Sequence, residues 1–153
     1  MLKIGDKAPN FKLKDQSGVE HILKEYLNNK KKVLIYFYPK DNTPGCTTEA
    51  CSFRDGIKYL KKLGLAVIGI SKDSVNSHKK FSDKYKLNFP ILSDENLHTI
   101  KAYNAYGPKK FMGREYYGVF RKSVLVNEKG KIEKIYETVK PEKHVGEVKE
   151  DLK

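Results

Sequence analysis

A strand–helix–strand pattern between residues 33 and 70 constrains the fold of this chain more than any other feature. Residues 33–38 form a continuous apolar run, which is typical of a strand covered on both faces. Apolar residues then recur at the three- and four-residue spacing of a helix, at Ala50, Phe53, Ile57 and Leu60. Gly64 suits a left-handed cap at the end of that helix, and residues 65–70 form a second apolar run. This order predicts a parallel βαβ unit with a right-handed crossover.

Two hairpins are predicted outside this unit. Residues 11–22 alternate weakly around a turn at Ser17-Gly18, which indicates an N-terminal β-hairpin. Residues 123–127 and 131–137 flank a turn at Glu128-Lys129-Gly130 and indicate a second hairpin near the C-terminus.

Further helices are expected in the second half of the chain. One is predicted from about Ser74 to Lys86, and a short strand at 90–92 follows it. Another helix is expected after Asp94 as its N-cap, and a last one opens at Pro141. The predicted fold class is therefore α/β, with a mixed central sheet flanked by helices in a thioredoxin-like order.

The length of 153 residues predicts a single domain, residues 1–153, and 39% hydrophobic residues are enough for a core. No stretch approaches the roughly 20 apolar residues that cross a bilayer. The N-terminus reaches Asp6 without the apolar region of an export signal. We therefore expect a soluble, cytoplasmic protein with no membrane partner.

The formal net charge of +12 raises the alternative of a nucleic-acid-binding protein. However, only three of the 31 basic residues are arginines, Arg54, Arg114 and Arg121, and the lysines are spread along the whole chain. Because arginine is the usual reader of phosphates and bases, this composition favours a solvated lysine-rich surface. No nucleic-acid partner is expected.

The two cysteines, Cys46 and Cys51, are the main candidates for chemistry. A structural disulfide is not expected in a chain without an export signal, and the four scattered histidines complete no metal-ligand set. Cys46 comes just after the first parallel strand, in the first turn of the following helix. Free backbone amides and the helix dipole there favour a thiolate. A buried inert thiol is the alternative, but the flanking Pro, Gly and Thr residues are not those of an apolar core.

The spacing of the two cysteines has a consequence for any bond between them. Five residues along a regular helix place the two Cα atoms roughly 8–9 Å apart. A disulfide does not close beyond about 7 Å. A Cys46–Cys51 bond would therefore require the first turns of this helix to unwind. Thr43, three residues before Cys46, is expected either to approach the sulfur or to cap the helix.

Residues 36–51, Tyr-Phe-Tyr-Pro-Lys-Asp-Asn-Thr-Pro-Gly-Cys-Thr-Thr-Glu-Ala-Cys, closely resemble the active-site segment of the peroxiredoxins. Among these they resemble the peroxiredoxin Q, or bacterioferritin comigratory protein, subfamily. The core pattern Pro-x-x-x-Thr-x-x-Cys is met by Pro39, Thr43 and Cys46. Similar segments continue to Gly118-Val119-Phe120-Arg121, so the resemblance covers nearly the whole chain.

The resemblance implies a role for each matching residue. Cys46 would be the peroxidatic cysteine, which attacks the peroxide and becomes a sulfenic acid, and Cys51 would resolve it as an intramolecular disulfide. Thr43 would bind the thiolate and the peroxide, Arg121 would stabilise the thiolate and the leaving oxygen, and Pro39 would shield the pocket.

The same resemblance implies the substrates and partners. The substrate would be hydrogen peroxide or an organic hydroperoxide, and thioredoxin or a related dithiol protein would recycle the enzyme. No metal, haem or flavin cofactor is expected. A monomer is sufficient for this cycle, and a weak dimer is compatible with it. The rival enzyme class is a thioredoxin-like thiol–disulfide oxidoreductase acting on proteins, for which a Cys-x-x-Cys motif would be expected.

Overall fold

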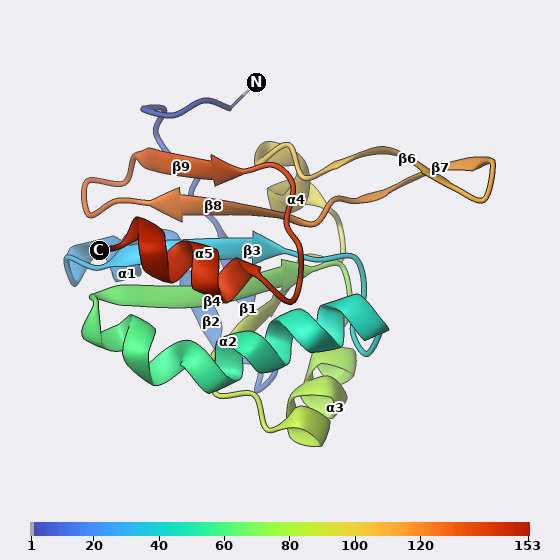
Figure 1. Ribbon diagram of the computed structural model, residues 1–153, viewed down its shortest axis with the longest axis horizontal. Coiled ribbons are helices and arrows are strands. Elements are labelled where there is room, and N and C mark those ends of the chain that lie inside the picture. Colours follow the sequence, from blue (N-terminus) through green and yellow to red (C-terminus); the bar gives the residue numbers. More distant parts are fainter. Residues whose placement is uncertain (1) are drawn as a thin grey trace.

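The computed structural model describes residues 2–153, and its centre is one mixed β-sheet with helices on both faces (Figure 1). The seven strands of this sheet lie in the order β2-β1-β5-β4-β3-β8-β9, and β6 and β7 form a separate two-stranded sheet. The elements are β1 Lys12–Lys14, β2 Glu20–Ile22, α1 Leu23–Asn28, β3 Lys32–Phe37, α2 Pro44–Lys62, β4 Leu65–Ser71, α3 Val75–Tyr85, β5 Ile91–Ser93, α4 His98–Ala102, β6 Tyr106–Phe111, β7 Arg114–Val119, β8 Lys122–Val126, β9 Ile132–Tyr136 and α5 His144–Asp151.

The predicted βαβ unit is confirmed as β3–α2–β4. The two strands run parallel, with Leu34 opposite Val67, and α2 crosses over between them. Gly64 ends the connection with a φ of 80°, a left-handed conformation that glycine adopts without the steric penalty of a Cβ atom. β5 extends the parallel part of the sheet beside β4.

Antiparallel strands complete the sheet on both sides. β8 pairs with β3 and forms the predicted C-terminal hairpin with β9, while β1 and β2 form the predicted N-terminal hairpin. The pairing of β3 with β8 matters for the site, because Phe37 at the end of β3 lies opposite Lys122 at the start of β8. The segment before β8 therefore lies beside the loop that follows β3.

The alternation of side chains along β3 divides the core into two layers. Leu34, Tyr36 and Tyr38 face one side, where α2, α3 and α5 pack against the sheet. Val33, Ile35 and Phe37 face the other side, which α1 and α4 cover. All six of these side chains are at most 1% exposed. The prediction that this strand is covered on both faces is confirmed.

Two sequence expectations need correction, and two elements were not predicted at all. Asp94 does not precede α4 as its N-cap, since Leu97 occupies that position; the Asp94 carboxylate instead accepts a hydrogen bond from the Ile100 N–H at 2.7 Å. Pro141 lies in a turn, and α5 begins only at His144. Helix α1 and the β6–β7 hairpin were not predicted, because α1 is only six residues long and β6 contains a proline and a glycine. Within residues 2–153 no helix is long and apolar enough to cross a membrane.

Candidate active site

Cys46 lies in the first turn of α2, at the carboxyl end of β3. Pro44 is the first helical residue, where its missing N–H breaks no helical hydrogen bond. Thr43 has the extended backbone of an N-cap residue, and its carbonyl accepts the first helical hydrogen bond from Thr47 at 2.8 Å. Cys46 is only 2% exposed, so its sulfur sits in a largely water-free environment beside the positive end of a helix.

Arg121 reaches this sulfur from the segment between β7 and β8. Its Nη2 donates a hydrogen bond to Cys46 Sγ at 3.3 Å, and its Nη1 donates to Glu49 Oε1 at 2.8 Å. Gly45 permits this approach, because a Cβ atom there would lie 3.0 Å from Nη2. One guanidinium therefore bridges the thiol and a buried carboxylate.

The electrostatics of this group are those of one cation shared by two anion-forming side chains. Burial by itself lowers the pKa of Arg121, but the neighbouring Cys46 and Glu49 outweigh it and raise that pKa above its usual value. Burial raises the pKa of Glu49 to about 7, and Arg121 offsets only part of that rise. Lys109 of β6 is close enough to interact with this group: burial and then the positive charge of Arg121 lower the pKa of Lys109. The site therefore carries a firm positive charge at Arg121 and a carboxyl that titrates near neutrality.

Two buried oxygens at this site have no hydrogen-bond partner within the described chain. They are the Tyr36 hydroxyl and Glu49 Oε2; the third such oxygen in residues 2–153 belongs to Asp94. Tyr36 is fully buried, and burial, followed by the charges of Glu49 and Cys46, raises its pKa well above 10. Unsatisfied buried polar atoms are costly, so two of them among residues that interact with Cys46 and Arg121 mark this part of the core as functional.

Thr43 does not cap α2 with its side chain. Its hydroxyl donates to the Lys40 carbonyl at 2.8 Å, so the oxygen keeps its lone pairs available as acceptors. Pro39 is half-buried and begins the loop between β3 and α2. The structure therefore brings Cys46 and Arg121 into direct contact, and positions Thr43 and Pro39 on the loop that leads to the cysteine.

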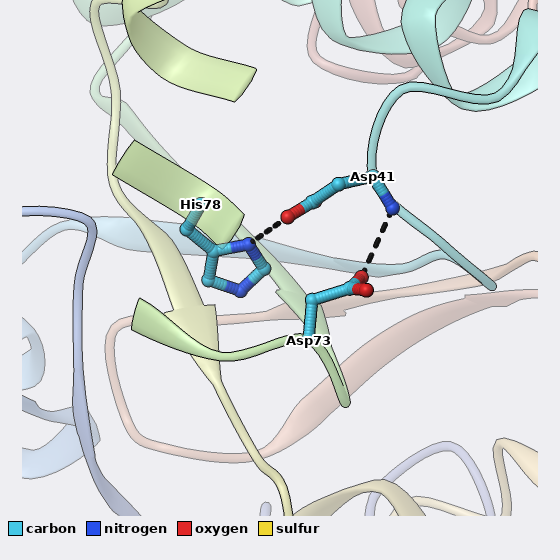
Figure 2. A group of neighbouring side chains, drawn as sticks. All are labelled: Asp41, Asp73 and His78. Atoms are coloured by element: carbon cyan, nitrogen blue, oxygen red, sulfur yellow. Dashed lines mark hydrogen bonds and ion pairs between the residues drawn. The ribbon is translucent and has the colours of Figure 1, made fainter. Parts of the chain in front are cut away.

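A polar cluster that the sequence analysis missed anchors this loop (Figure 2). Asp41 Oδ2 lies 2.7 Å from His78 Nδ1, and its backbone N–H donates to Asp73 at 3.0 Å. The other ring nitrogen of His78 lies 3.0 Å from the Leu92 carbonyl, and Tyr38 donates to Asp41 Oδ1 at 2.6 Å. Both ring nitrogens of His78 thus face oxygen atoms, the Asp41 carboxylate on one side and the Leu92 carbonyl on the other.

The side-chain oxygen and nitrogen atoms of Asp41, Asp73 and His78 that could bind a metal ion lie within 4.8 Å of one another. Its hydrogen bonds indicate an anchor between the loop, β4 and α3 instead, since each of the three side chains already has a partner. The residues lie up to 37 positions apart, so no local spacing could have revealed them. Glu49 was also missed, although it follows Cys46 by three residues on the same face of a predicted helix.

Cys51 lies further along α2 and is half-buried, and both cysteines are free thiols. α2 is continuous from Pro44 to Lys62, so the two Cα atoms are separated by the roughly 8–9 Å of a regular helix. The structure is therefore that of the reduced, helical state, in which the two sulfurs cannot bond.

Comparison with known proteins agrees with this geometry. Residues 4–135 match the profile of the AhpC/TSA family, and curated relatives above 40% identity span almost the whole chain. The chain therefore belongs to the AhpC/TSA family, as a peroxiredoxin of the Bcp, or Q, subfamily.

The individual relatives make the relationship specific. Peroxiredoxin Bcp of Escherichia coli is 43% identical over 143 residues, which are 94% of this chain and 90% of the relative. Peroxiredoxin Bcp of Bacillus subtilis is 40% identical over 152 residues, 99% of this chain and 96% of the relative. The bacterioferritin comigratory protein of Xanthomonas campestris, studied for its alkyl peroxide reduction activity, superposes with a TM-score of 0.89 at 30% identity, covering 99% of this chain and 96% of that one. These relatives confirm the thioredoxin-like fold.

Proposed function

We propose that this peroxiredoxin reduces hydrogen peroxide and organic hydroperoxides with Cys46 and restores the thiol through a disulfide with Cys51. The observation that carries this proposal is the Arg121 hydrogen bond to Cys46 Sγ at 3.3 Å inside the core. A cation fixed at that distance stabilises the thiolate, which is the nucleophilic form of cysteine.

The first step forms a sulfur–oxygen bond. The Cys46 thiolate attacks the terminal oxygen of the peroxide, the O–O bond breaks, and the sulfur becomes a sulfenic acid. The second peroxide oxygen leaves with the bonding electron pair and takes up a proton, which gives water from hydrogen peroxide or an alcohol from a hydroperoxide. The sulfur is oxidised and the peroxide is reduced by two electrons.

The residues around Cys46 fit this step. Arg121 presents several N–H groups in one plane, so it can hold the thiolate and then the charge that develops on the leaving oxygen. The Thr43 oxygen, whose own proton points to the Lys40 carbonyl, can accept a hydrogen bond from the peroxide O–H. Pro39 would limit the access of water at the start of the loop.

The second step forms the disulfide. The Cys51 thiolate attacks the Cys46 sulfur, the sulfur–oxygen bond of the sulfenic acid breaks, and the oxygen leaves with the bonding electron pair and takes up a proton to give water. Because the helix holds the two residues apart, the first turns of α2 must unwind before this attack. Thioredoxin or a similar dithiol protein would then reduce the disulfide by two successive thiol exchanges. We place this cycle in the cytoplasm. A monomer is sufficient for it, because both cysteines belong to one chain.

Peroxide titration of the reduced protein, followed by intact mass and free-thiol counting, tests the cycle. We expect loss of about 2 Da and of both thiols when the disulfide forms. The matched variant Cys51→Ser should instead gain about 16 Da or about 32 Da and lose one thiol. Cys46→Ser should keep its remaining thiol under the same treatment. Reaction of Cys51 in the absence of Cys46 would reverse the proposed roles, and inert thiols at micromolar peroxide would exclude a peroxidase.

An insulin-reduction assay without peroxide distinguishes the rival activity. A protein thiol–disulfide oxidoreductase would reduce insulin disulfides without any peroxide, whereas the proposed enzyme needs peroxide to oxidise Cys46. We therefore expect no insulin reduction beyond that of the added dithiol.

A further inference from the structure

The β6–β7 hairpin projects from the body of the molecule, beyond the end of β3 at which α2 begins (Figure 1). Its two strands pair only with each other, and residues 110–117 are exposed on both strands. β7 ends at Val119, two residues before Arg121, so the root of the hairpin adjoins the active site. A two-stranded hairpin has little stability of its own in water, so this projection contributes little to the stability of the fold.

The hairpin concentrates the exposed apolar surface of the chain. Phe111 and Met112 at its tip are 67% and 90% exposed, and Tyr116 and Tyr117 stand behind them. Of the seven large hydrophobic side chains exposed in residues 2–153, these are four. Scattered apolar residues on a surface need no explanation, but a cluster rimmed by charges is typical of an interaction site.

The charges on the hairpin have one dominant sign. Lys110 and Arg114 flank the tip, whereas Lys109 donates to the Val119 carbonyl at 2.9 Å at the root of the hairpin. Glu115 is the only acid between Tyr106 and Val119, which gives three positive charges minus one, or +2. Lys101 adds a fourth cation close by, over the ring of Tyr106 at 5.3 Å. The whole chain carries a net charge of +12, so its long-range field also favours an anionic partner.

We propose that the β6–β7 hairpin docks this protein on anionic lipid membranes, with Phe111 and Met112 inserted among the headgroups. From the tip to the root, the hairpin presents apolar, then cationic, then tyrosine side chains, and these match the successive layers of a bilayer surface. The apolar tip enters the acyl boundary, the cations Lys110 and Arg114 meet lipid phosphates, and the tyrosines lie at headgroup depth, where aromatic side chains are enriched.

Other occupants fit this surface less well. A second copy of the chain would bring another charge of +12 to a tip that is itself cationic, and like charges repel. A stable protein partner needs about 800 Å² on each side, whereas the tip is the turn of a single two-stranded hairpin. The expectation of no membrane partner rested on the absence of a spanning segment, and peripheral docking requires none. Docking by this hairpin would bring the Cys46 end of the molecule to the membrane surface.

Vesicle co-sedimentation tests the proposal without any enzymatic turnover. The probes are vesicles of phosphatidylcholine alone and vesicles in which about one third of the lipid is phosphatidylglycerol, in about 0.1 M salt. We expect binding only to the anionic vesicles. Phe111→Ser/Met112→Ser should weaken it at least about tenfold. Lys110→Glu/Arg114→Glu should weaken it by more than about twentyfold, since each cation near an anionic surface contributes about a factor of five.

Matched variants elsewhere on the surface decide whether the hairpin is responsible. Ile4→Ser/Val19→Ser removes two apolar side chains that are 66% and 57% exposed, and it should bind like the wild type. Equal binding by the hairpin and control variants would assign the attraction to the general positive charge and overturn the proposal, as would no binding to anionic vesicles. A dimer that Phe111→Ser/Met112→Ser dissociates, in a protein that ignores vesicles, would make the hairpin a self-association surface instead. Oxidation of Cys46 by peroxide checks that each variant is folded. If the wild type binds vesicles but its Cys46 is not oxidised, the proposed peroxidase function is wrong and the docking proposal stands.

Discussion

Arg121 Nη2 lies 3.3 Å from Cys46 Sγ, although 75 residues separate the two along the chain. The antiparallel register of β3 and β8 creates this contact, because it sets Lys122 opposite Phe37 and so brings Arg121 beside the loop that follows β3. Glu49 fixes the other side of the guanidinium at 2.8 Å. The position of the cation therefore depends on the long-range pairing of the sheet and on one turn of α2.

Arg121→Lys should slow the oxidation of Cys46 by hydrogen peroxide by about 100-fold to 1000-fold, the usual effect of losing one donor to a developing oxyanion. A lysine keeps the charge but is a single point donor, so it cannot hold Sγ and Glu49 in one plane. Rapid mixing, acid quench and thiol mass labelling would give the second-order rate constant. Arg54→Lys is the control, because Arg54 donates to the Tyr85 carbonyl between α2 and α3. An equal loss in both variants would mean that the effect is structural.

Oxidation should locally unwind α2. Because the Cα atoms of Cys46 and Cys51 are roughly 8–9 Å apart in a helix and must come within about 7 Å, the disulfide and the helical first turns exclude each other. Hydrogen exchange should show lost amide protection around residues 46–51 after treatment with peroxide, while residues 57–62 stay protected. Cys51→Ser, treated in the same way, should keep its protection. Unchanged protection in a protein whose disulfide is verified by mass would disprove the unwinding.

The sequence predicted the parts of the fold that depend on local patterns. The apolar run at 33–38 and the stripe from Ala50 to Leu60 each carry their own periodicity, so the βαβ unit could be recognised without knowledge of the rest. The β6–β7 hairpin carries no such signal: residues 110–117 are all exposed, so nothing there selects an alternation of apolar and polar residues. Pro108 within β6 further masks it.

The candidate site was predictable only where a motif is compact. Cys46, Cys51, Thr43 and Pro39 lie within 13 residues, and Arg121 was placed by its family resemblance. The Asp41–His78 contact joins a loop to a helix 37 positions away, and only tertiary packing creates it. The burial of Glu49 likewise depends on how α2 lies on the sheet, because a carboxylate on a helix is ordinarily expected to face water.

Asp41→Asn should both destabilise the protein and slow Cys46 oxidation. Asp41 accepts from Tyr38, Ser77 and His78, so the change weakens three hydrogen bonds in a buried cluster, at a cost of about 2–4 kcal/mol in the free energy of unfolding. Urea unfolding of the reduced protein and the oxidation rate constant measure the two effects. Asp15→Asn removes a similar carboxylate–histidine contact, to His21, in the N-terminal hairpin. It should lower stability without a change in oxidation rate, and equal slowing would show that Asp41 does not specifically position the loop.

Tyr36→Phe should stabilise the protein by about 1–2 kcal/mol. The Tyr36 hydroxyl is buried without a partner in the described chain, and removing an unsatisfied polar group recovers its desolvation cost. The ring should stay in place, because it stacks on Phe53 with a centroid distance of 4.7 Å. Tyr103→Phe is the matched control, since that hydroxyl donates to the Pro9 carbonyl, and its loss should destabilise. Destabilisation by both changes, in urea unfolding, would mean that the Tyr36 hydroxyl has a partner in solution.

Glu49 should make stability fall as the pH rises through the weakly acidic range. Burial raises its pKa from 4.5 to about 7 in the folded protein, so the folded state holds a proton that the unfolded state has already released. Stability therefore decreases between about pH 4.5 and about pH 7, and the total loss from this group is about 3 kcal/mol. His144 acts in the opposite direction, because burial lowers its pKa and the unfolded state takes up a proton first as the pH falls below about 6.5.

Glu49→Gln isolates the first effect, since it leaves His144 unchanged. The amide keeps an oxygen that can accept from Arg121 Nη1 but has no proton to release. Urea unfolding of the reduced wild type and variant, measured at several values between about pH 5 and about pH 8, gives the difference in unfolding free energy. The wild type should lose about 3 kcal/mol relative to the variant across that range. A difference that stays constant with pH would show that Glu49 remains ionised throughout, and Arg121 would then be neutralised by the carboxylate even in acid.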